Sequence, residues 1–189
     1  MPIISLKTGT KSRSLLVGNP YFQPTAYESI ASYAPTSGST VTFSSIPSTY
    51  KHLQLRCLTI ETLGNGYSLG IQFNGDNSAI YTTHSLYGTG SSAGATGASS
   101  VQNYVPFGYG PGLVATYPNV GIIDIIDYAS TTKYKTVRAF FGANNNSTNG
   151  GIELTSAVYQ TTSAITSITL DFPSTGVTGS SYALYGIKG

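Results

Sequence analysis

The chain has 189 residues, which is enough for one domain with a core of its own. Charged residues make up 8% of it and the formal net charge is +2, so no basic run is present that could neutralise several phosphates of a nucleic acid. With 40% hydrophobic residues and 15 tyrosines, the composition also excludes disorder caused by low hydrophobicity and high charge.

Residues 1–25 show no regular hydrophobic pattern and contain three prolines, so they predict an extended N-terminal arm outside the main core. The arm has no signal-peptide pattern, because its basic residues follow its first apolar residues. We expect it to dock on a neighbouring subunit, by pairing with a sheet edge or lying in a groove; a disordered leader is the alternative. The expected contact residues are Lys7, Lys11, Arg13, Leu15 and Leu16.

From residue 26 onward, apolar and polar residues alternate with period two, which is typical of half-buried strands. Short Gly- and Asn-containing segments such as 63–66, 74–77 and 149–151 separate the strands and predict turns. Residues 26–189 therefore predict a single all-β domain, an antiparallel β-sandwich that is jelly-roll-like. The ten expected strands are 27–33, 39–46, 52–61, 67–73, 80–86, 120–128, 136–141, 152–160, 165–172 and 182–187.

Residues 88–118 interrupt this rhythm and predict a long loop, beginning with the Gly-rich run 88–97. The run lacks the Lys-Ser/Thr of a phosphate-binding loop, and no helix pattern follows it. Clustered aromatic residues in such a loop favour a protein interface, with sugar contact or ordinary packing as alternatives. The expected interface residues here are Tyr104, Phe107, Tyr109 and Tyr117.

The sequence contains no convincing catalytic constellation, so we expect a protein that is not an enzyme. His84, Ser85 and Asp76 are the residue types of a hydrolytic triad, but the strained turn that presents a nucleophilic serine is missing. Asp124 and Asp127 lie three apart in an expected strand and so face opposite ways. One should face solvent, and the other should lie in a turn or beside a basic partner, Lys133 or Lys135.

Metal and cofactor sites are likewise not expected. The chain has two histidines and one cysteine, without the spacing of a zinc site. Cys57 lies in the apolar run 53–58, which predicts a buried thiol that packs as a small hydrophobic residue. No stretch approaches the roughly 18 apolar residues of a membrane-spanning helix, so we expect no membrane partner.

An ordered series of segments resembles a family of tailed-bacteriophage virion structural proteins. The series begins with Ser14-Leu15-Leu16-Val17-Gly18-Asn19 and continues through 27–31, 43–56, 73–76, 122–128, 135–138 and 165–170 to the ending at 179–188. The chain departs from the family pattern in two places: Tyr159 stands in a strand that often carries Trp, and residues 88–118 match a stretch that varies widely.

The resemblance implies a virion protein with a sandwich or jelly-roll domain, assembled in the cytoplasm of a host bacterium. We expect a capsid decoration or cement protein that stabilises the head shell through protein–protein contacts. A tail-fibre or tail-tip module that binds host surface glycans is the alternative. The expected partners are further copies of the chain in a homotrimer, together with the major capsid protein or tail proteins.

Overall fold

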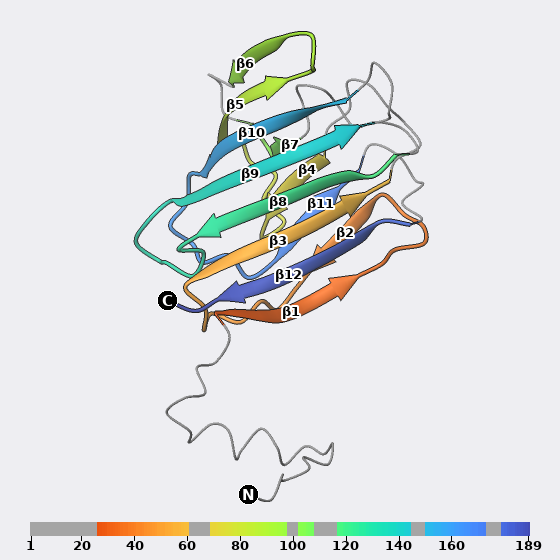
Figure 1. Cartoon of the computed structure of the whole chain (residues 1–189). Helices are drawn as coiled ribbons and strands as arrows, with labels where there is room; N and C mark the ends of the chain where they lie inside the picture. Colours follow the sequence, from red (N-terminus) through yellow and green to blue (C-terminus); the bar gives the residue numbers. More distant parts are fainter. Residues whose placement is uncertain (1–25, 61–68, 98–101, 108–116, 145–149, 173–178) are drawn as a thin grey trace, which may run out of the picture.

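A computed structural model describes residues 26–60, 69–97, 102–107, 117–144, 150–172 and 179–189. These residues form two antiparallel sheets that pack face to face, with the larger sheet in front of the smaller one in Figure 1. The prediction of an all-β antiparallel sandwich is therefore confirmed. The N-terminal arm, residues 1–25, lies outside the described residues. No helix in the described ranges has the length and apolar character needed to cross a membrane.

The large sheet has the strand order β1-β12-β3-β8-β9-β10-β5-β6, and the small sheet has the order β2-β11-β4-β7. The strands of the large sheet are β1 (Tyr27–Tyr33), β3 (His52–Thr59), β5 (Tyr81–Gly88), β6 (Ala93–Gly97), β8 (Asn119–Ile126), β9 (Lys135–Asn144), β10 (Gly150–Tyr159) and β12 (Ser181–Ile187). Those of the small sheet are β2 (Thr40–Phe43), β4 (Leu69–Phe73), β7 (Val105–Phe107) and β11 (Ile168–Asp171).

Eight of these strands pair in a nested order. β1 pairs with β12, β2 with β11, β3 with β8, and β4 with β7. This nesting over two sheets is the arrangement of a jelly roll. Two hairpins, β5–β6 and β9–β10, are inserted into it, and both extend the large sheet beyond β8. The large sheet is consequently twice as wide as the small one.

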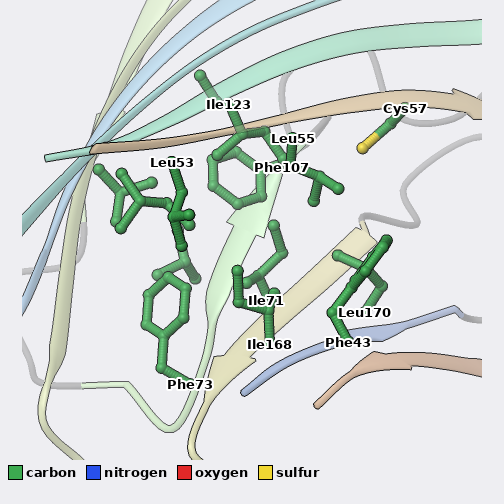
Figure 2. Packing of buried hydrophobic residues seen from close by; sticks show 14 of the residues in the cluster. Phe43, Leu53, Leu55, Cys57, Ile71, Phe73, Phe107, Ile123, Ile168 and Leu170 are labelled. Carbon is green, nitrogen blue, oxygen red and sulfur yellow. The ribbon is translucent and has the colours of Figure 1, made fainter. Parts of the chain in front are cut away.

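The core lies between the sheets, because alternate residues of each strand point inward. Figure 2 shows Leu53, Leu55 and Ile123 of the large sheet facing Ile71 and Ile168 of the small sheet. All five side chains are fully buried. At one end of this core the rings of Tyr81 and Tyr159 stack with centroids 4.9 Å apart.

All ten expected strands are present, but the expectation of a continuous loop over residues 88–118 is wrong. Ala93–Gly97 forms β6, which pairs with β5, and Val105–Phe107 forms β7, which pairs with β4. The Gly-rich run consists of a hairpin turn at residues 89–92 followed by β6, and the turn is closed by a hydrogen bond from the Thr89 amide to the Ser92 carbonyl, with Gly90 at a φ of 87°. Residues 98–101 and 108–116 lie outside the described residues.

Candidate interaction surface

The outer face of the large sheet carries six large apolar side chains that the fold leaves in solvent. Their exposed fractions run from 43% for Ile122 to 61% for Leu86. We call this set the outer patch; its members are Leu86, Val120, Ile122, Phe140, Ile152 and Leu154. Each lies next in the chain to a residue of the opposite phase that points inward, as Ile122 does to Ile123 and Phe140 to Phe141. At Ile122 and Phe140 the strands are therefore apolar on both faces, whereas the inward neighbours of Leu86 and Leu154 are polar.

Strand register brings the outer patch together. Leu86, Leu154, Phe140 and Ile122 are successive cross-strand partners on β5, β10, β9 and β8. Direct cross-strand partners have Cβ atoms about 4.5–5.5 Å apart, so these four side chains form a continuous ridge across the sheet.

In the next row of cross-strand partners beside the ridge, glycines alternate with residues that carry large side chains. Ile152 pairs with Gly88 on one side and Gly142 on the other, and Gly142 pairs in turn with Val120. The missing side chains leave an open groove of about 810 Å³ that is lined by these four residues and by Pro118, among others. A ridge and a groove thus lie side by side on one face.

A polar border flanks the other side of the ridge. The Gln54 amide donates a hydrogen bond to the Asp124 carboxylate over 2.9 Å, and the Arg56 Nε donates to Gln54 Oε1 over 3.2 Å. The Arg56 guanidinium also lies over the ring of Tyr185, 5.6 Å from its centroid. Arg138, an exposed residue, is the cross-strand partner of Asp124. One acidic side chain, Asp124, and two basic ones, Arg56 and Arg138, therefore adjoin the ridge.

Three of the interface residues expected from the sequence are described by the structure, and they do not form one surface. Phe107 is fully buried in the core, where its ring stacks on Phe141 with centroids 5.5 Å apart. Tyr104 is partly exposed and lies against Gly70 on the outer face of the small sheet. Tyr117 is exposed and precedes Pro118 at the groove. The structure therefore corrects the expectation for Phe107, which is a core residue. The other expected residues, Lys7, Lys11, Arg13, Leu15, Leu16 and Tyr109, lie outside the described residues.

The three residue types of a hydrolytic triad do not meet. His84 is exposed on the outer face of β5, whereas Ser85 points inward and is buried. The Ser85 hydroxyl is hydrogen-bonded to Thr155 over 2.7 Å, and the Thr155 hydroxyl is 2.8 Å from a carboxylate oxygen of Glu153. This buried row of hydroxyls and a carboxylate belongs to the packing of β5 on β10, and it has no histidine within it.

Asp76 has a structural role in the turn after β4. Its carboxylate accepts hydrogen bonds from the Ser78 amide over 2.9 Å and from the Tyr159 hydroxyl over 3.2 Å. The bonds with Ser78, followed by that with Tyr159, lower the pKa of the Asp76 carboxyl. Burial, followed by the nearby Asp76 charge, raises the pKa of Tyr159 to about 12. Asp76 therefore helps to fix the turn against the core tyrosines.

The other two candidate aspartates, Asp124 and Asp127, take separate positions, as the sequence indicated. Asp124 lies on the outer face of β8, and Asp127 lies in the following turn with a φ of 51°. Lys133 Nζ is 2.9 Å and Lys51 Nζ 3.2 Å from the Asp127 carboxylate, and these two cations lower its pKa. Lys135 is not the partner: its buried ammonium donates to the carbonyls of Lys133 and Thr161.

Cys57 is buried and unpaired, and burial raises the pKa of its thiol, so it packs as a small hydrophobic residue. Within the described ranges no group of three or more His, Cys, Asp or Glu side chains could hold a metal ion.

Sequence reasoning missed the outer patch altogether. The sequence contained a signal, because Ile122-Ile123 and Phe140-Phe141 place apolar residues on both faces of strands that were expected to be half-buried. Apolar residues in both phases normally indicate a strand that is covered on both sides. Here one of those sides is open.

The comparisons with known proteins add little to this geometry. No protein-family model matches the sequence, and no curated protein matches it. Among solved structures, a protein of unknown function from Shewanella oneidensis MR-1 is similar at 11% sequence identity, with a TM-score of 0.25 over 76% of this chain. The match spans 61% of that protein's length. At this TM-score the similarity carries no argument about fold or function.

Proposed function

We propose that the chain is a non-enzymatic structural component of a bacteriophage virion, a capsid decoration or cement protein that stabilises the head shell. The observation that carries the proposal is the outer patch, a broad apolar surface that a single chain leaves exposed and that suits a subunit of a larger assembly. Surfaces of this kind on soluble proteins mark contacts with other proteins. The sequence resemblance to virion proteins supplies the setting, and a homotrimer is part of the proposal on the same grounds.

The chemistry of the described residues is consistent with a binding role. Ser85, Asp76 and Glu153 are each engaged in hydrogen bonds that hold strands and turns together. The polar residues on the open face, such as Gln54, Arg56 and Asp124, bond to one another. This arrangement suits a protein that contacts other proteins rather than one that transforms a substrate.

A second candidate is a tail adhesion module that binds host surface glycans. The groove of about 810 Å³ favours it, because Pro118 at its wall follows the exposed Tyr117, and an aromatic ring beside a groove can stack on a sugar.

The position of the chain on purified phage particles distinguishes the two candidates. Heads and tails are separated, and the copy number of the chain in each is measured by quantitative mass spectrometry. A decoration protein is expected on heads in hundreds of copies, whereas a tail module is expected in a handful. Absence of the chain from purified particles would contradict both candidates.

A further inference from the structure

We propose that the outer patch and its groove form a contact surface for a second copy of this chain. The ridge of Leu86, Leu154, Phe140 and Ile122 would pack against the neighbouring copy, and part of that copy's ridge would enter the groove at Gly142. This contact rests on the same outer patch as the proposed function, but it can be tested on the purified chain without a particle.

The size of the patch supports a protein contact. Six side chains with exposed fractions of 43–61% present roughly 600 Å² of apolar surface, which is the upper end of the range for the largest patch on a typical monomer. A stable interface of standard size buries about 800 Å² on each partner. The outer patch supplies most of that area, and its polar border adjoins it.

Two of the five glycines that line the groove, Gly88 and Gly142, indicate that the groove is kept open for something outside the monomer. A Cβ added at Gly142 would lie 3.8 Å from its nearest neighbours, and one at Gly88 would lie 3.9 Å from Ile152, which are ordinary contacts. Neither glycine has a positive φ. The fold of one chain therefore does not require glycine at either position. If the ridge of another copy enters the groove, however, a side chain at either position would be in its way, and glycine would be required.

The polar border makes the face complementary to itself. Asp124 and Arg138 are neighbours beside the ridge and carry opposite charges. In a contact between copies, the acidic side chain of one copy can meet a basic side chain of the other. Arg56 lies in the same border, so the border offers both signs of charge to a neighbouring copy.

The test is the mass of the purified full-length chain, measured by sedimentation at roughly 1–100 µM, the range in which weak interfaces of this size dissociate. We expect an oligomer of the 19.8 kDa chain that Phe140→Asp converts to a monomer. Gly142→Val, which fills the groove without adding charge, should weaken association at least tenfold. The matched control is Tyr134→Asp, because Tyr134 is 59% exposed but lies outside the outer patch. This variant should remain an oligomer, and circular dichroism should show all three variants folded.

Two results would overturn the proposal. A wild-type chain that stays a monomer over the whole concentration range would leave residues 1–25 or a different protein to cover the face. An oligomer whose mass is unchanged by both Phe140→Asp and Gly142→Val would place the contact elsewhere. The proposed virion function fails separately, through absence of the chain from particles, so the two failures are distinguishable.

Discussion

Phe141 lies directly across from Gly121 in the β8–β9 pair, and its ring occupies the space that a side chain at position 121 would need. A Cβ at Gly121 would stand 2.5 Å from the ring. Phe141 is fixed from the other side by Phe107, on which it stacks. Gly142, the next residue after Phe141, points to the open face and has free space around it. Packing in the core therefore requires glycine at position 121, whereas the fold of one chain does not require glycine at position 142 on the surface.

This difference gives the first prediction. Gly121→Ala should lower the free energy of unfolding by about 1–3 kcal/mol, because the added methyl group overpacks a ring that cannot move. Gly142→Ala is the matched control and should leave the dilute chain unchanged or raise its stability by about 0.5–1 kcal/mol, since alanine loses less backbone entropy on folding. Urea unfolding of both variants at low protein concentration measures the difference. Equal destabilisation by the two substitutions would contradict this account of the two positions.

The second prediction concerns Tyr81, which joins the core to the turn after β4. Its hydroxyl accepts a hydrogen bond from the Phe73 amide over 3.1 Å and donates one to the Asp76 carbonyl over 2.9 Å. Tyr81→Phe keeps the ring stacked on Tyr159 but removes both bonds, and should cost about 1–3 kcal/mol. Tyr134→Phe, on an exposed ring, should cost almost nothing. Thermal unfolding compares the two; a Tyr81→Phe protein as stable as wild type would show that the hydroxyl is not needed.

The third prediction follows from Asp127, whose pKa is lowered by Lys133 and Lys51. A carboxyl with a lower pKa in the folded state binds fewer protons than in the unfolded state, so its stabilising effect is present above the unfolded pKa of about 4 and is lost as the pH falls through the folded pKa. Asp127→Asn keeps a residue type that tolerates the positive φ.

The Asp127→Asn variant should therefore be less stable than wild type at pH 7, and the stabilities of the two proteins should converge as the pH falls through the folded pKa of Asp127. The difference at pH 7 should also shrink in high salt, because both lysines are exposed. Chemical denaturation at a series of pH values measures the difference in the free energy of unfolding between wild type and Asp127→Asn. A difference that stays constant from pH 7 to pH 2 would mean that the charge of Asp127 has no part in it.

Strand positions were accessible from the sequence because alternation of side chains is enforced by burial on one face. The pattern in Thr40–Phe43 gives β2 directly, since Val41 and Phe43 are buried and the threonines between them are exposed. β6 was missed because Ala93–Gly97 has almost no apolar side chains to alternate. β7 was missed because it is three residues long and contains Pro106, a residue that disfavours strands.

The interaction surface was less accessible, for a different reason. Alternation identifies the face that is buried in one chain, but it does not show what covers the other face. Ile122 and Phe140 lie on different strands, and only the register of β8 and β9 reveals that they are partners. Similarly, Phe107 was grouped with neighbouring aromatic residues of the sequence, whereas the pairing of β7 with β4 turns its ring into the core.

The central claim, that the outer patch is covered by a second copy, is tested most directly by the reactivity of a thiol placed within it. Cys57 is buried, so a cysteine introduced at Leu154 would be the reactive one in the described part of the chain. We expect maleimide labelling of Leu154→Cys to slow at least tenfold as the protein concentration rises, and labelling of Tyr134→Cys to stay unchanged. Equal labelling rates for Leu154→Cys at all concentrations would contradict it.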